Sequence, residues 1–172
     1  PGQRLAEAGR HPGGQPVAGP VIGQEVRFEA LGRVLVALQM GLLGLLAWWG
    51  AQAPFVPLAT WGLGGGALLL GVWALGTNRP GNFNIRPTPH PEGRLIRHGP
   101  YRWIRHPMYV AVLLAGAACA AAATGVRGWV VLAFLAGVLV VKARLEERWL
   151  AARHPDYAAY RSGTAGFIPG WF

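Results

Sequence analysis

Two long stretches without a charged residue constrain this chain more than any other feature. Residues 34–56 and 55–78 contain no Asp, Glu, Lys or Arg, and they overlap at a proline-containing turn. A helix of about 20 residues crosses a hydrocarbon layer of roughly 30 Å. Both stretches reach that length, so the sequence predicts two membrane crossings joined by a short turn.

Two shorter apolar stretches follow, at residues 108–124 and 128–141. Each is a little short for a crossing unless its helix extends beyond the apolar core. Hydrophobic residues make up 52% of the chain and charged residues only 13%, which is too apolar for an ordinary soluble domain. We therefore predict an all-α polytopic membrane protein with about four transmembrane helices, the last two forming a tight hairpin.

The same pattern divides the chain into three parts. Residues 1–29 form a polar leader whose Gly- and Pro-rich composition is typical of a disordered tail. Residues 30–77 hold the first two crossings, which carry no motif and are interpreted as scaffold. Residues 78–172 hold a polar loop, the hairpin and a C-terminal segment, and we expect them to carry the function.

The net charge of +9 would suit nucleic-acid binding, but its distribution argues for a membrane protein. Successive connections between membrane spans lie on alternate sides of the membrane. Of the 16 Lys and Arg residues, only Arg127 lies in a connection on the opposite side from the others. All seven carboxylates and all five histidines also fall on the majority side. Under the positive-inside rule both termini and residues 78–107 are cytosolic. Any chemistry is then expected on the cytosolic face, and no nucleic-acid partner is predicted.

Residues 79–107 are rich in proline and contain three histidines, so they predict a structured loop and not a helix. The loop runs into the third apolar stretch as Arg105-His106-Pro107-Met108-Tyr109. One interpretation is an interfacial anchor, because headgroup regions favour Arg, Trp and Tyr. The other is a ligand site, because proline in the first helical turn exposes backbone donors beside a cation and an imidazole. Such a site suits a carboxylate or an adenine edge.

A second polar group, residues 142–150, lies where the fourth helix is expected to leave the membrane. A solvated turn of mixed charge is one interpretation. The other rests on Glu146, which follows the apolar core by about one helical turn and lies level with the loop. A carboxylate there can pair with a ligand cation or with ribose hydroxyls.

Two further features are assigned to packing. Residues 62–67 fit a dinucleotide-binding fingerprint, but they lie inside an apolar span with no strand before them. Close helix packing through Gly62 and Gly66 is predicted instead. Cys119, the single cysteine, lies in the third apolar stretch and is also assigned to core packing.

Taken in order, several motifs resemble the isoprenylcysteine carboxyl methyltransferase family and the wider group of small membrane methyltransferases, which includes phospholipid- and thiol-methylating members. The resemblance covers about residues 80–170. The motifs are Leu95, Gly99-Pro100-Tyr101, Arg105-His106-Pro107-Met108-Tyr109, Glu146-Glu147-x-x-Leu150, Tyr157-x-x-Tyr160 and Ile168-Pro169.

The resemblance implies a cytosolic loop that folds over S-adenosylmethionine with the end of the fourth helix, without a Rossmann sheet. The cofactor contacts that it implies are Gly93, Arg94, Leu95, Ile96, Tyr101, Arg105, His106, Pro107, Met108, Tyr109 and Glu146. Lys142 and Glu147 are expected on the acceptor side, and no metal site is expected. His106 or Glu147 becomes a candidate base if the acceptor is an amine.

The implied acceptor is lipophilic and enters from the bilayer: an isoprenoid or prenylcysteine-like carboxylate, a lipid, or a small thiol. Lys142 stands where the prenylcysteine enzymes handle the carboxylate of the acceptor. Lys142 departs from the family pattern there, because Lys lacks the bidentate fork of Arg. A second departure is Gly166, where relatives often carry a basic residue. The abundance of Gly, Ala and Arg is compatible with a GC-rich bacterial genome, and hence with the bacterial cytoplasmic membrane.

Two other functions stay open at this point. NADPH-dependent membrane sterol and steroid reductases are similar around Arg-His-Pro-x-Tyr, but they often have Asn and Glu at the places of Met108 and Val112. The carboxylate pair after the hairpin also favours the methyltransferase. A non-enzymatic lipid-binding subunit is the other alternative, and the presence of both His106 and Glu146 argues against it.

Overall fold

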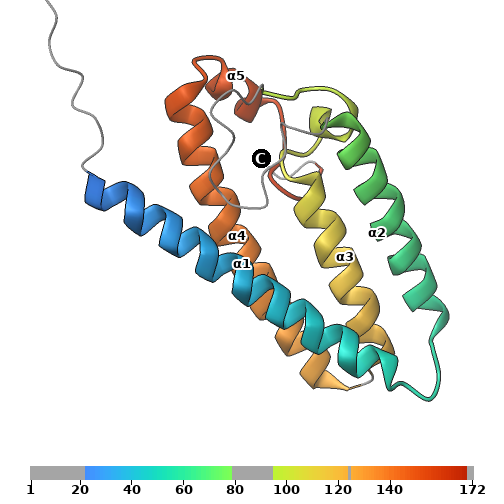
Figure 1. Ribbon diagram of the computed structural model, residues 1–172. Coiled ribbons are helices and arrows are strands. Elements are labelled where there is room, and N and C mark those ends of the chain that lie inside the picture. The colour runs from blue at the N-terminus through green and yellow to red at the C-terminus, as the bar shows by residue number, and fades with distance from the viewer. Residues whose placement is uncertain (1–21, 79–94, 124, 170–172) are drawn as a thin grey trace, which may run out of the picture.

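The computed structural model describes residues 22–78, 95–123 and 125–169, and these residues are helical wherever they have regular structure (Figure 1). The elements in chain order are α1 (Ile22–Ala51), α2 (Leu58–Thr77), the 3-10 turn η1 (Gly99–Arg102), α3 (Pro107–Ala122), α4 (Val126–Arg153) and α5 (Tyr157–Ser162). Within these residues there is no strand, and a single isolated parallel bridge joins Ile104 to Ala165. The all-α prediction is confirmed.

Three helices are long and apolar enough to cross a membrane: α1 from Glu29 to Ala51, α2, and α4. The third predicted stretch forms α3, which has only 16 residues and is shorter than a full span. Its crossing, and with it the count of four, stays a prediction. α1 begins at Ile22, earlier than the boundary predicted at residue 30, and α4 continues well beyond the apolar core that ends at Val141.

Small residues let α2 and α3 approach closely. A Cβ added at Gly71 would lie 3.7 Å from Ala111, and one at Gly64 would lie 4.0 Å from Ala118. The predicted close packing through Gly62 is wrong, because no atom of a neighbouring element lies within 4 Å of a Cβ added there. The packed face follows the helical period through 64, 67, 71 and 74, and Gly62 points away from it. Gly66 touches this interface only at its edge, 4.0 Å from Leu114.

The core between α1, α3 and α4 is built on Leu46, Ala120, Leu135 and Leu139, all fully buried, and Cys119 packs against it as predicted. α3 and α4 lie against one another, because a Cβ at Gly128 would stand 3.1 Å from the Ala120 backbone. The chain passes from one helix to the next through Gly125, whose φ of 92° favours glycine.

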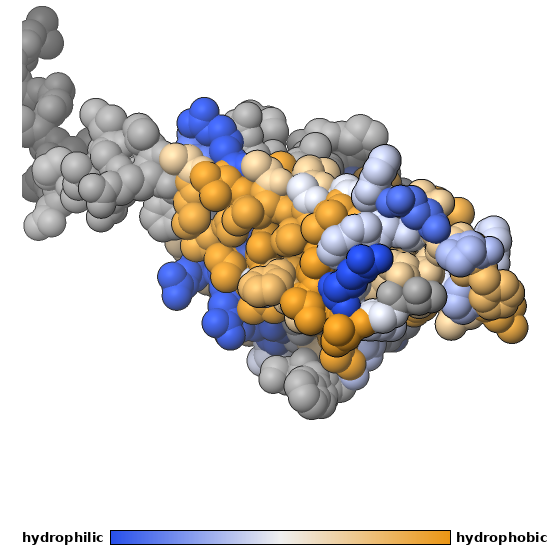
Figure 2. Space-filling view, turned by 90° about the horizontal axis from the view of Figure 1, so that it is seen from below, coloured by the Kyte–Doolittle hydropathy of each residue, from blue (hydrophilic) through white to orange (hydrophobic). Residues whose placement is uncertain are grey.

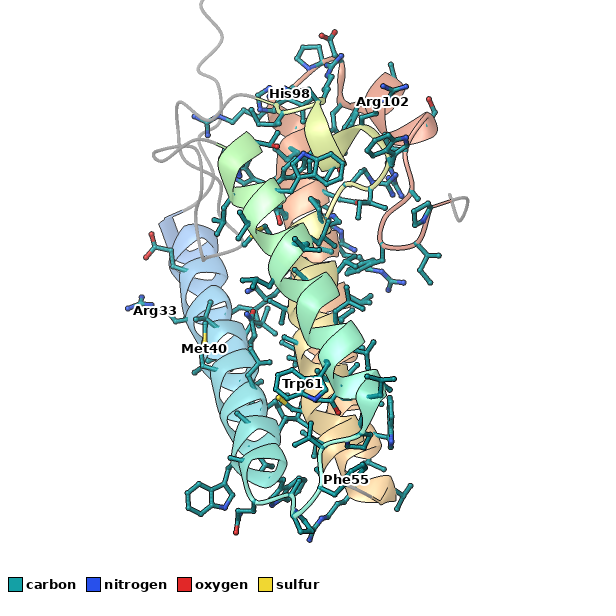
Figure 3. The ribbon with its side chains drawn as sticks, turned by 90° about the vertical axis from the view of Figure 1, so that its right-hand side faces the viewer. Arg33, Met40, Phe55, Trp61, His98 and Arg102 are labelled. Atoms are coloured by element: carbon teal, nitrogen blue, oxygen red, sulfur yellow. The ribbon has the colours of Figure 1, made fainter. Side chains whose placement is uncertain are left out.

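Large apolar side chains cover much of the outer surface. Trp48, Phe55, Leu58, Trp61 and Phe134 are all at least 66% exposed, as suits a surface that faces lipid. Figure 2 shows that hydrophobic residues prevail at one end of the molecule. In Figure 3, His98 and Arg102 lie at the end of the bundle opposite Phe55. The polar segments therefore gather at the end where α3 begins.

Gly99, the first residue of η1, packs against Thr77 at the end of α2. This close approach generates the first prediction. The φ of Gly99 is 60°, and an added Cβ would stand 2.5 Å from the Thr77 hydroxyl oxygen. Gly99→Ala is expected to lower the free energy of unfolding by about 1–2 kcal/mol, measured by thermal unfolding in detergent. Gly62→Ala is the matched control and should be neutral or slightly stabilising. Equal melting temperatures for the two variants would contradict this account of the junction.

Candidate active site

Three segments that are distant in sequence meet where α3 begins and α4 leaves its apolar core. They are the loop 95–106, the α4 segment 142–147 and the C-terminal segment 160–168 (Figure 1). The loop and the C-terminal segment are paired by backbone hydrogen bonds: the Arg105 N–H donates to the Ala165 carbonyl at 2.8 Å, and the His106 N–H donates to the Gly166 carbonyl at 3.2 Å. This pairing holds His106 directly before the first turn of α3.

Glu147 ties both segments to α4. Its carboxylate accepts hydrogen bonds from Arg105 Nε at 2.8 Å and from His106 Nε2 at 3.1 Å, the latter when the ring proton is on that nitrogen. Arg161 Nε lies 3.7 Å from the second carboxylate oxygen. Arg105 also donates to the backbone carbonyls of Arg161 and Thr164. Only 13% of the Glu147 side chain and 8% of the Arg105 side chain are exposed.

The acceptor-side role expected for Glu147 stays a prediction, and in this structure its carboxylate is engaged within the fold. A carboxylate engaged by two guanidinium groups and an imidazole is a weak base, because each partner favours its charged form. His106 is similarly committed, since its side chain is 4% exposed and both ring nitrogens face carboxylates. In this structure the two side chains hold the loop on α4.

Glu146 has a different environment from its neighbour. Its Oε2 accepts a hydrogen bond from the Tyr109 hydroxyl at 3.1 Å and lies 3.7 Å from His106 Nδ1. Tyr109 is fixed in turn by stacking on the His106 ring, with centroids 5.3 Å apart. The Glu146 side chain is 31% exposed, so its carboxylate keeps acceptor capacity for a ligand.

Lys142 is buried one turn before Glu146, with 1% of the residue exposed. Its Nζ donates to Gln39 Oε1 of α1 at 2.5 Å and lies 5.2 Å from the centroid of the Tyr109 ring. Sequence reasoning missed Gln39, although a polar amide inside an otherwise apolar span is itself a signal, because such groups are rarely tolerated without a partner. Lys142, Tyr109 and Glu146 thus form one polar line.

Of the other implied cofactor residues, Tyr101 lies close enough to interact with Glu146. Tyr101 in η1 is hydrogen-bonded to Asn78, and burial raises the pKa of Tyr101 to about 12, so its hydroxyl remains protonated. Leu95, Ile96 and Met108 are half-buried and Pro107 is buried. Gly93 and Arg94 lie outside the described residues.

The backbone donors predicted at the start of α3 are partly used within the chain. The N–H groups of Tyr109 and Val110 both donate to the His106 carbonyl at 3.1 Å. These two N–H groups are therefore already engaged and contribute less to the expected backbone site for a carboxylate or an adenine edge. Among the described residues, no three His, Cys, Asp or Glu side chains are arranged to hold a metal ion.

Comparison with known families agrees with this arrangement. Residues 66–152, just over half of the chain, match the model of the isoprenylcysteine carboxyl methyltransferase (ICMT) family. The chain belongs to this family. The matched region contains α3 and most of α4, and with them Tyr109, Lys142 and Glu146. As a member of the ICMT family, the chain is a methyltransferase-type membrane protein with transmembrane helices.

The cobalt-zinc-cadmium resistance protein CzcN of Cupriavidus metallidurans is similar to part of the chain, with 39% identity over 77 residues. The match covers 44% of this chain and 35% of CzcN, so the chain spans about a third of that relative. No solved structure matches the chain.

The two adjacent glutamates generate the second prediction. Glu147→Gln is expected to lower the free energy of unfolding by about 3 kcal/mol, because it leaves the buried Arg105 guanidinium without its counter-ion. Glu146→Gln is the matched control, and it should cost less than about 1 kcal/mol because its side chain is partly exposed. Thermal unfolding in detergent measures both variants. A larger loss in Glu146→Gln would reverse the roles assigned to the pair.

Proposed function

We propose that the chain transfers a methyl group from S-adenosylmethionine to a lipophilic acceptor at the polar end of its helical bundle. The observation that carries the proposal is the line of Lys142, Tyr109 and Glu146, in which a buried cation and a partly exposed carboxylate flank one phenol ring. Ionisable groups at this depth in a membrane protein mark a functional site by default.

The chemistry of Glu146 fits the proposed donor. A carboxylate with unused acceptor capacity can take the ribose hydroxyls of the nucleoside or lie beside its positive charge. The Tyr109 hydroxyl fixes the orientation of Glu146 by donating to Oε2 at 3.1 Å. Tyr101, Leu95, Ile96 and Met108 are proposed to provide the remaining walls, with Gly93 and Arg94 expected on the same loop.

Lys142 is proposed to meet the reacting head of the acceptor. Its ammonium group is held by Gln39 at 2.5 Å, so it presents a fixed positive charge among apolar helices. Such a charge favours an anionic head, either a carboxylate or a thiolate, over a neutral amine. Because Lys offers a point charge without the bidentate fork of Arg, it places weaker geometric demands on a carboxylate and also accommodates a single sulfur atom.

The mechanism needs little acid or base chemistry from the protein. S-adenosylmethionine, when bound, supplies a methyl group on a sulfonium that is already a good leaving group. Glu146 and Tyr109 orient the donor site, and Lys142 orients the nucleophile. The surrounding apolar helices exclude water from the line between them. No proton has to be removed from a carboxylate or thiolate, which agrees with the commitment of Glu147 and His106 to structure.

The proposed topology places both termini and the site on the cytosolic side of a bacterial cytoplasmic membrane. It follows from the distribution of Lys and Arg along the chain. In this topology α3 is also a crossing, the third of four, and forms a hairpin with α4. The acceptor then reaches Lys142 sideways from the bilayer, while the donor arrives from the cytosol.

The donor site is tested by binding S-adenosylhomocysteine to the detergent-purified chain in a calorimeter. The wild-type chain should bind it, and Glu146→Gln should weaken binding by about tenfold or more, because a charge-assisted hydrogen bond is lost. Asp156→Asn, which removes an exposed ion pair with Arg97, is the control and should bind like wild type. NADPH binding in place of S-adenosylhomocysteine would assign the site to a reductase, and binding of neither would sink the enzymatic proposal.

The acceptor side is tested by methyl transfer to a prenylated cysteine carboxylate and to a long-chain alkyl thiol. Lys142→Met keeps the length of the side chain and removes its charge. It should lower kcat/KM for the active acceptor by about tenfold or more, with S-adenosylhomocysteine binding unchanged. Parallel losses of donor binding and of turnover would show that Lys142 supports the donor and not the acceptor.

A further inference from the structure

A groove of about 370 Å³ lies between α4 and the C-terminal segment, on a different side of α4 from Lys142 and Glu146. Its residues are Arg105, Val140, Ala143, Arg144, Glu147, Gly166, Phe167 and Ile168. Positions 140, 143, 144 and 147 share one face of the helix, whereas 142 and 146 share another, about 130° away. The groove is therefore separate from the proposed methyl-transfer line, and the inference below does not rest on that reaction.

The walls of the groove divide into an apolar part and a basic part. Val140, Phe167 and Ile168 provide the apolar part, and Ile168 is 59% exposed. Arg144 is exposed at the rim, and within the described part of the chain it makes no ion pair. Arg105 also lines the groove, and Arg161 approaches Glu147 beside it. Three cations against one carboxylate leave this end of the groove positively charged.

The groove also lies at the depth where lipid headgroups are expected. Val140 is in the last turn of the apolar core of α4, and Arg144 is one turn farther along the helix. One turn is about 5.4 Å, so the groove passes from hydrocarbon depth to headgroup depth over its own length. An amphiphile with an apolar chain and an anionic head matches this order of surfaces.

We propose that the groove binds an anionic phospholipid of the cytosolic leaflet, with its phosphate at Arg144 and part of an acyl chain along Val140, Phe167 and Ile168. The bound lipid would bridge α4 and the C-terminal segment. Because the same segment pairs with residues 103–106 of the loop, lipid binding stabilises this pairing as well.

Gly166 is a position in the wall of the groove where a side chain can be added. Its φ is not in the positive region, and an added Cβ would stand 3.6 Å from the Arg105 guanidinium, which is ordinary van der Waals contact. A larger side chain at this position extends into the space of the groove. Gly166→Leu is therefore a variant that blocks the groove, and Arg144→Gln is the variant that removes the positive charge proposed to bind the lipid phosphate.

The test is native mass spectrometry of the full chain in detergent with dioleoyl phosphatidylglycerol and dioleoyl phosphatidylcholine. The wild-type chain should retain one phosphatidylglycerol more tightly than phosphatidylcholine. Arg144→Gln should weaken retention of phosphatidylglycerol by about fivefold, the effect of one basic residue near an anionic lipid. Gly166→Leu should weaken the retention of both lipids. Arg148→Gln is the control, because Arg148 is exposed on the same helix and does not line the groove.

Three results would overturn the proposal. The first is equal retention of the two lipids by the wild-type chain. The second is a loss in Arg148→Gln as large as that in Arg144→Gln, which would indicate diffuse attraction to a basic surface. The third is displacement of phosphatidylglycerol by millimolar inorganic phosphate, which would make the groove a site for the free anion.

Discussion

The carboxylate of Glu147 is the contact on which the polar end of this protein depends. It joins α4 to Arg105 and His106 of the loop and to Arg161 of the C-terminal segment, which lie 42, 41 and 14 positions away in sequence. Burying charges this deeply is unfavourable unless each one finds its partners. Loop, helix and C-terminal segment therefore have to assemble together, and the position of His106 before α3 follows from that assembly.

The commitment of Glu147 also determines what its neighbour can do. Consecutive residues on a helix point about 100° apart, so Glu147 faces the C-terminal segment while Glu146 faces Tyr109. His106 lies between them, with one ring nitrogen toward each carboxylate. One glutamate is used for structure, and the other keeps acceptor capacity for a ligand. A single carboxylate in this place could not serve both ends.

Hydropathy patterns predicted the helical class and the first two long spans, because apolar length carries that information. The family resemblance, and not hydropathy, implied that Tyr109 and Glu146 lie at one ligand site. Neither predicted that Glu147 pairs with Arg105, since adjacent identical residues differ only in what tertiary packing brings to them. They also missed Gln39, whose contact with Lys142 spans 103 positions. The packing face of α2 was misassigned at Gly62 because a glycine-rich stretch offers several faces, and only the position of α3 selects one.

The length of α3 bears on how an acceptor reaches the site. Its 16 residues rise about 24 Å, which is less than a hydrocarbon layer of roughly 30 Å. In the proposed topology α3 cannot carry His106 and Tyr109 clear of the membrane, although the longer α4 does project beyond it. The site then lies at the boundary between acyl chains and headgroups, with Lys142 one turn deeper along α4 than Glu146. A short third helix surrounded by α1, α2 and α4 thus favours an acceptor that never leaves the bilayer.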